Sequence, residues 1–119
     1  MSKILLVEDQ DEVRWVLRRY LERADYHVEE APDGEVALEL YRENPADLVV
    51  TDLMMPRKCG LELIMDLRCE WPHVKIIAIS TSEKMLAQAR LTGATEALRK
   101  PFLPSKLLEI IKQMLEGSR

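Results

Sequence analysis

Three carboxylates follow apolar runs in this sequence, at places where buried strands would end. Glu8 and Asp9 follow the run KILLV at 3–7, and Asp52 follows the run DLVVT at 47–51. If these strands lie near one another, the carboxylates repel one another and raise one another's pKa unless a cation intervenes. Mg²⁺ suits such oxygen ligands, because it binds one or two carboxylates together with waters and a phosphate. The acids therefore indicate a magnesium site, with Asp52 as a candidate nucleophile.

A hydroxyl and an ammonium accompany two further runs. Ser80 closes the run KIIAIS at 75–80, and Lys100 follows the run EALR at 96–99. An ammonium can pair with a carboxylate or with a phosphoryl oxygen, and a hydroxyl can donate a hydrogen bond to the same group. An aspartate beside Mg²⁺, an ammonium and a hydroxyl is suited to attack phosphorus and form an acyl phosphate. The two residues after Ser80 also carry hydroxyls, but alternation within the run favours Ser80.

Five short apolar runs alternate with segments of helical period, and the second of these runs is HVEEA at 27–31. Strict alternation of strands and helices predicts an α/β fold, with a parallel sheet and helices on both faces. Right-handed crossovers favour the doubly wound strand order 2-1-3-4-5, in which strands 1 and 3 meet at the switch point that forms the ligand crevice. Five helices are expected, over segments that include 13–24, 36–41, 61–68, 83–91 and 107–115.

The first helical segment has a wide apolar face and one aromatic residue outside it. Trp15 lies off the face and near Arg18 and Arg19, so we expect it to be partly exposed. Such a residue usually packs only locally. The alternative is that Trp15 anchors a helical partner protein, as an aromatic side chain does at the centre of an interface. The face itself, predicted to pack on the sheet, contains Val13, Val16, Leu17, Tyr20, Leu21 and Ala24.

Composition bounds the remaining possibilities. The 119 residues are 47% hydrophobic and 32% charged, which is typical of one globular domain over 1–119. A net charge of −4 argues against direct binding of nucleic acid, and no apolar run is long enough to span a membrane. The start leads directly into a short strand without a secretory signal, so we expect a cytoplasmic protein.

The two cysteines, Cys59 and Cys69, stand ten residues apart. This spacing matches neither a CxxC redox pair nor half of a zinc site. Two reduced thiols in a cytosolic protein are the simpler interpretation, and a redox role for Cys59 beside the candidate site is the alternative.

Taken together, the strand-end residues resemble the signature of the response-regulator receiver domain. A single piece such as DxxMP is a weak signal, but the full set in order covers essentially the whole chain. The matching residues are Glu8-Asp9, Asp52 with Met55-Pro56 and Gly60, Ser80, and Lys100-Pro101-Phe102.

The resemblance implies a flavodoxin-like fold and a phosphoacceptor of two-component signal transduction. Asp52 would receive the phosphoryl group from a histidine kinase or a histidine phosphotransfer protein, as in a phosphorelay. The receiver would then relay the signal by a conformational change to an output domain or downstream protein, on the face formed by helix 4, strand 5 and helix 5. The chain would act as a signalling module rather than as an enzyme.

The resemblance also assigns roles to individual residues. Mg²⁺ would be held by three carboxylates and one backbone carbonyl, and two further side chains would contact the phosphoryl oxygens. The Lys100–Pro101 peptide bond is usually cis in this family. The expected metal ligands are Glu8, Asp9, Asp52 and the backbone carbonyl of Met54, and the expected phosphoryl contacts are Ser80 and Lys100.

Three positions depart from the family pattern. Ala97 stands three residues before the lysine, where a tyrosine or phenylalanine is usual, so this position has no ring to move during signalling. Thr81 replaces a smaller residue and could narrow the approach to the site. Ser80 and Lys100 are 20 residues apart, somewhat fewer than usual, which predicts a shortened fourth helix.

Other functions stay open. A Mg²⁺-dependent phosphatase with an aspartyl nucleophile would commonly carry a second acid two residues later, where this chain has Met54. A nucleotide or flavin module would want a glycine-rich loop, which the four glycines do not form. A degenerate receiver that serves only as a docking module is a third alternative. We expect either a stand-alone receiver or a domain cut from a longer regulator.

Overall fold

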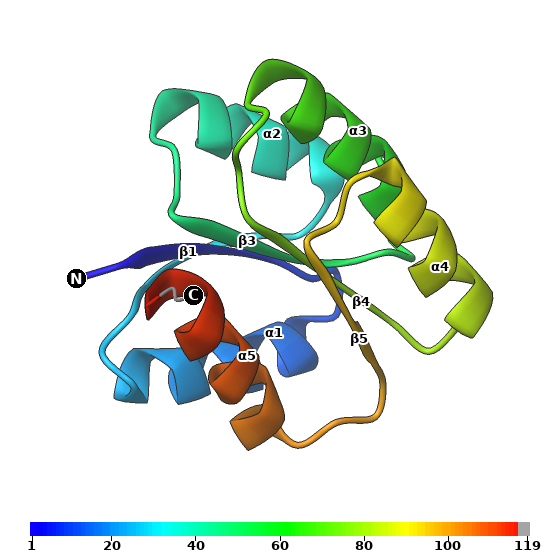
Figure 1. The fold of residues 1–119 in the computed structure, drawn as a ribbon. Coiled ribbons are helices and arrows are strands. Elements are labelled where there is room, and N and C mark those ends of the chain that lie inside the picture. The colour runs from blue at the N-terminus through cyan, green and yellow to red at the C-terminus, as the bar shows by residue number, and fades with distance from the viewer. Residues whose placement is uncertain (117–119) are drawn as a thin grey trace.

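Strands and helices alternate strictly along the chain in the computed structural model, which describes residues 1–116 (Figure 1). The strands are β1 Lys3–Val7, β2 His27–Ala31, β3 Leu48–Asp52, β4 Ile76–Ser80 and β5 Glu96–Arg99. The helices are α1 Asp11–Arg23, α2 Gly34–Glu43, α3 Gly60–Glu70, α4 Glu83–Thr92 and α5 Pro104–Glu116.

The five strands form one parallel sheet in the order β2-β1-β3-β4-β5, which confirms the predicted flavodoxin-like, doubly wound topology. Helices α2, α3 and α4 cover one face of the sheet, and α1 and α5 cover the other (Figure 1). The winding reverses between β1 and β3, so the crevice of the fold lies at the carboxyl ends of these two strands.

Each face of the sheet has its own hydrophobic core. Leu5 and Val49 pack toward α2, α3 and α4, while Leu6 and Val50 pack toward α1 and α5. Because successive strand residues point to opposite faces, a strand that is covered on both faces must be apolar throughout. The central strands β3 and β4 are buried along their whole length, whereas β2 and β5 are partly exposed edge strands.

The prediction for the first helix is wrong at two positions. Val16 and Tyr20 were expected on the packed face, but they are 48% and 37% exposed. Leu17 and Leu21 fill the contact with the sheet, so the wide apolar face of α1 is only partly covered. Trp15 is exposed as predicted, at 58%, and the Arg19 guanidinium lies 5.0 Å from its ring centroid.

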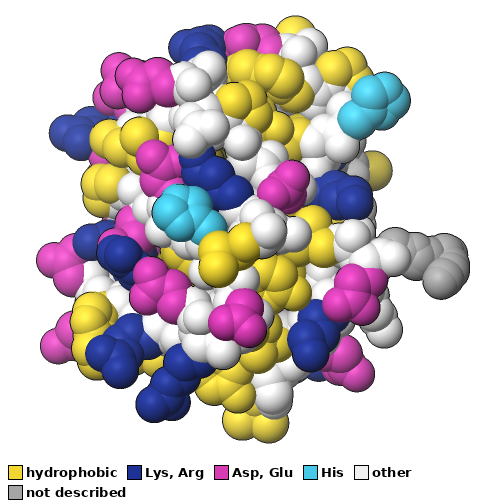
Figure 2. All heavy atoms as spheres, turned by 90° about the vertical axis from the view of Figure 1, so that its left-hand side faces the viewer, with side chains coloured by type: hydrophobic (Ala, Val, Ile, Leu, Met, Phe, Trp, Pro, Cys, Tyr) yellow, Lys and Arg dark blue, Asp and Glu magenta, His cyan; other side chains and the backbone are white. Residues whose placement is uncertain are grey.

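The surface shows no grouping of charge by sign on the face drawn in Figure 2, where basic and acidic side chains are interspersed. Within residues 1–116 no helix has the length and apolar character needed to cross a membrane. Cys59 and Cys69 are both free thiols.

Candidate functional site

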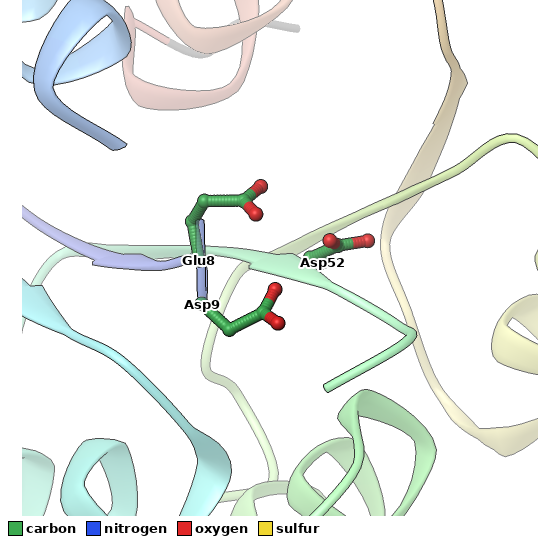
Figure 3. Close-up of side chains that lie close together, drawn as sticks. All are labelled: Glu8, Asp9 and Asp52. Carbon is green, nitrogen blue, oxygen red and sulfur yellow. The ribbon is translucent and has the colours of Figure 1, made fainter. Parts of the chain in front are cut away.

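The three predicted acids meet at the switch point of the sheet. Parallel pairing of Val7 with Thr51 places the ends of β1 and β3 side by side. Glu8 and Asp9 extend from the end of β1 toward Asp52, the last residue of β3 (Figure 3). One carboxylate oxygen from each of the three side chains lies within 4.8 Å of the other two. The cluster can therefore offer one cation three oxygen ligands.

Lys100 lies between two of these carboxylates. Its Nζ is 3.4 Å from Glu8 Oε1 and 3.3 Å from Asp52 Oδ2. The Lys100 backbone N–H donates to the Ser80 carbonyl at 2.9 Å, which anchors the start of the β5–α5 loop to the end of β4. The Lys100–Pro101 peptide bond is cis, as the family resemblance implied.

One ammonium does not neutralise three carboxylates, and the pKa values of Glu8 and Lys100 are both raised. Burial raises the pKa of Glu8, and the charge of Asp52 raises it further, against the opposing effects of the Gln10 N–H and Lys100. Burial alone would lower the pKa of Lys100, but the charges of Asp52 and Glu8 outweigh it and raise that pKa. The site thus carries surplus negative charge in a buried place, which favours binding of a cation.

The loop after β3 closes tightly against the end of that strand. The Leu53 N–H donates to Asp52 Oδ1 at 2.8 Å, and the Gly60 N–H donates to the Leu53 carbonyl at 3.0 Å. A Cβ at residue 60 would lie only 2.4 Å from the Asp52 carbonyl oxygen, so glycine is required for this close approach. The loop therefore returns to the phosphoacceptor candidate before α3 begins.

Ser80 is the last residue of β4 and is buried. Its register position is one residue beyond Ile79, which pairs with Asp52 across the β3–β4 ladder. The Ser80 hydroxyl accepts a hydrogen bond from the Ser82 N–H at 3.0 Å, so this bond leaves its own proton free to be donated. Thr81, which the sequence suggested could narrow the approach, is exposed.

Two hollows lie near the site, one beside Asp9 and one beside Lys100. The first is bounded by Asp9, the loop after β3 and the first turn of α4, and it is lined by Asp9, Leu53, Met54, Met55, Pro56, Cys59 and Met85. The second lies beside Lys100 and is lined by Gln10, Glu12, Val13, Val16, Leu17, Lys100, Pro101, Phe102 and Pro104. The exposed apolar side chain of Met54 lines the first hollow, and that of Val16 lines the second.

One charged contact near the site was missed by the sequence analysis. Asp33 precedes α2 and caps it, since its Oδ1 accepts a hydrogen bond from the Val36 N–H at 3.0 Å. Its Oδ2 also pairs with the Arg57 guanidinium, which extends from the loop after β3. Nothing in the local sequence joins residues 24 positions apart, so only the folded chain reveals this pair.

The comparisons with known proteins agree with this geometry. The family model described as the response regulator receiver domain matches residues 4–112. The chain is 33% identical to Protein CcdB of Bacillus subtilis (strain 168), covering 97% of this chain and 98% of that protein. It is also 33% identical to the transcriptional regulatory protein SrrA of Staphylococcus aureus (strain NCTC 8325 / PS 47), covering 99% of this chain but only 49% of SrrA.

Solved structures give the same result. Chemotaxis protein CheY4 of Vibrio cholerae matches with a TM-score of 0.88 and 31% identity, over 95% of this chain and 98% of the other. A putative response regulator from Chloroflexus aurantiacus matches with a TM-score of 0.92 and 28% identity, over 98% of both chains. The chain belongs to the response regulator receiver domains of two-component signalling.

Proposed function

We propose that this receiver accepts a phosphoryl group on Asp52 in a Mg²⁺-dependent reaction and relays the signal by a conformational change. The observation that carries the proposal is the convergence of three carboxylates and Lys100 at the switch point of the sheet. Both oxygens of Asp52 accept hydrogen bonds, one from the Leu53 N–H and the other from Lys100.

The donor set fits Mg²⁺. Three carboxylates within 4.8 Å of one another supply hard oxygen ligands with excess negative charge, and we assign the cation to Glu8, Asp9, Asp52 and the backbone carbonyl of Met54. When bound, Mg²⁺ would neutralise charge on the carboxylates and on the phosphoryl oxygens. Met54 belongs to the same hollow as Asp9, which is consistent with this assignment.

The chemical step is an exchange of one phosphorus bond for another. A carboxylate oxygen of Asp52 forms a bond to the phosphorus of a phosphohistidine on the donor, and the donor's P–N bond breaks. The electron pair of that bond stays on the imidazole nitrogen, so the product is an acyl phosphate and a free histidine. Lys100 and Ser80 then supply an ammonium and a hydroxyl to the phosphoryl oxygens, which stabilises their charge.

The donor of the phosphoryl group is a histidine kinase or a histidine phosphotransfer protein, which are the proteins that receivers interact with. We place its contact on the uncovered part of α1, because Trp15, Val16 and Tyr20 are exposed there and the second hollow opens beside Lys100. Trp15→Ala should slow transfer from the cognate donor while leaving phosphorylation by acetyl phosphate unchanged. An unchanged rate of transfer from the cognate donor would eliminate this placement.

The signal would leave by the face of α4, β5 and α5. Ala97 lies on β5, pairs with Ala78 of β4 and is partly buried against the core. Because alanine has no ring to move, output here would depend on displacement of the backbone of β4, β5 and α4. The pairing of Ser80 with Arg99 gives one path for such a displacement, since Ser80 contacts the phosphoryl group in this proposal.

Intact mass measurement with acetyl phosphate tests the proposal. The protein should gain the mass of one phosphoryl group when Mg²⁺ is present. Its mass should not change when the metal is removed, and neither should the mass of the Asp52→Asn variant. A gain in the variant would show that another residue is the acceptor. No gain under any condition would favour a degenerate receiver that acts only in docking, and turnover of added phosphate esters would favour a phosphatase.

A further inference from the structure

The loop between β3 and α3 is fastened at its far end to the start of α2. The Gly34 N–H donates to the Lys58 carbonyl at 3.1 Å, and a Cβ at residue 34 would lie 2.4 Å from that oxygen. The same loop carries Met54, whose carbonyl is a ligand in the proposed metal site. A contact at residues 57 and 58 therefore restrains a backbone that begins at Asp52 and passes through Met54.

The second fastening is the ion pair of Arg57 with Asp33. Arg57 Nη2 and Nε donate to Asp33 Oδ2 at 2.6 and 3.2 Å, and the Asp33 side chain is only 3% exposed. Burial would raise the pKa of Asp33, but the Val36 N–H and the Arg57 guanidinium outweigh it and lower that pKa. A buried carboxylate with this much compensation is held ionised, so it offers Arg57 a fixed and charged partner.

The backbone of Arg57 also points to a positional role. Its φ of 64° lies in the left-handed region. This conformation costs a non-glycine residue about 1 kcal/mol or more, so it persists only where the surrounding structure enforces it. The ion pair with Asp33 and the hydrogen bond that the Lys58 carbonyl accepts are the contacts that hold this part of the loop against α2. At the other end of the loop, Met54 and Asp9 line one hollow, so the position of the loop sets one wall of the hollow beside Asp9.

We propose that Arg57 is a positioning residue for the metal site, because its ion pair with Asp33 holds the loop that carries the Met54 carbonyl. The inference rests on the proposed function, in which that carbonyl and the three acids bind Mg²⁺. Arg57 is neither a proposed ligand of the metal nor a proposed contact of the phosphoryl group. It fixes the loop from outside, so its loss should weaken metal binding while leaving the three carboxylates unchanged.

Calorimetric titration with Mg²⁺ alone tests this role. Arg57→Asn removes the guanidinium and introduces a side chain that tolerates positive φ. Asp33→Asn removes the negative charge and keeps the oxygen that caps α2. Each variant should raise the Kd for Mg²⁺ by about tenfold, the lower end of the range in which supporting contacts act on metal affinity. The double variant should be no weaker than either single one, because both break the same contact. Arg57→Lys should fall between Arg57→Asn and the unaltered protein.

A matched control separates positioning from general stability. Arg42→Gln breaks another ion pair on the α2 and α3 layer, in which Arg42 Nη2 lies 2.6 Å from Glu70 Oε2, at the ends of those helices away from the acids. This variant should leave the Kd for Mg²⁺ unchanged. An unchanged Kd in Arg57→Asn, or an equal rise in Arg42→Gln, would overturn the inference. Absence of saturable binding to the unaltered protein would overturn the proposed metal site itself, and the inference with it.

Discussion

Glu8 and Asp33 are both buried carboxyls beside the ends of neighbouring strands, yet their pKa values move in opposite directions. The pKa of Glu8 is raised, because it is buried beside Asp52 and both share one ammonium. The pKa of Asp33 is lowered, because the Val36 N–H and the Arg57 guanidinium more than compensate its burial. The two carboxyls are similarly buried, yet Glu8 belongs to a cluster with surplus negative charge, whereas the charge of Asp33 is compensated by Arg57.

This difference in charge compensation distinguishes the cluster proposed to bind the ligand from the ion pair that stabilises the fold beside it. A surplus of buried charge is costly until a ligand arrives, so the cluster at Glu8 is suited to binding a cation and a phosphoryl group. A compensated pair needs no ligand and stabilises the fold directly, as at Asp33.

The largest expected effect is at Asp33. Asp33→Ala removes the cap of α2 and the partner of Arg57 together, and we expect it to lower the free energy of unfolding by about 2–3 kcal/mol. Urea denaturation at neutral pH measures this loss. Ser82→Ala is the matched control, since Ser82 caps α4 through the Met85 N–H without a charged partner, and it should cost about 1 kcal/mol. Equal losses in the two variants would mean that the Arg57 pair contributes nothing.

At Glu8 the change should have the opposite sign. Glu8→Gln removes one negative charge and keeps an oxygen that can accept from the Gln10 N–H, so the metal-free protein should become more stable. Mg²⁺ should then stabilise the variant less than it stabilises the unaltered protein, because one ligand is lost. Urea denaturation with and without Mg²⁺ gives both quantities. A destabilised metal-free variant would contradict the view that this cluster is strained by like charges.

The pH dependence of the Asp33 contribution is the next effect in size. The pKa of Asp33 is lowered below its ordinary value of 3.8, so its ionised form stabilises the folded state. That contribution is fully present above pH 3.8 and is lost as the pH falls through the lower folded-state pKa. The stability difference between the unaltered protein and Asp33→Asn should therefore shrink over this acidic range. A difference that stays constant with pH would show that charge is not its source.

The smallest effect should come from an exposed ion pair. Arg42 and Glu70 are both exposed, so Arg42→Gln should change the free energy of unfolding less than any of the other variants does. Denaturation midpoints measured beside those of Asp33→Ala compare a pair that is exposed on both sides with a pair whose carboxylate is buried. A loss as large as that of Asp33→Ala would show that burial does not distinguish them.

The sequence could predict the fold because central strands of a parallel sheet must be apolar on both faces. The runs near β1, β3 and β4 met that condition, and the acids at their ends followed from topology. Asp52 ends β3 as expected, but the predicted runs at 47–51 and 75–80 each begin one residue before the strand that forms. Boundaries shift easily because a strand's pairing depends on its neighbours.

Contacts between distant segments could not be predicted in the same way. Helical period showed that one face of α1 is apolar, but not how much of that face its neighbours cover, so Val16 and Tyr20 were placed wrongly. Arg57 stands in a loop, where a charged residue is usually solvated, and its pairing with Asp33 depends on how two loops pack. The spacing of apolar residues predicts helix faces and strand ends. An ion pair between distant loops, such as that of Arg57 with Asp33, can be identified only from the folded structure.

The central claim is that Asp52 forms the acyl phosphate. Borohydride reduces an acyl phosphate on aspartate to homoserine, so the phosphorylated residue can be located by mass spectrometry of the digested protein. After treatment with acetyl phosphate and Mg²⁺, we expect homoserine at position 52, and none when Mg²⁺ is left out. Homoserine at Asp9, or an unreduced Asp52 in protein whose intact mass includes a phosphoryl group, would contradict the account.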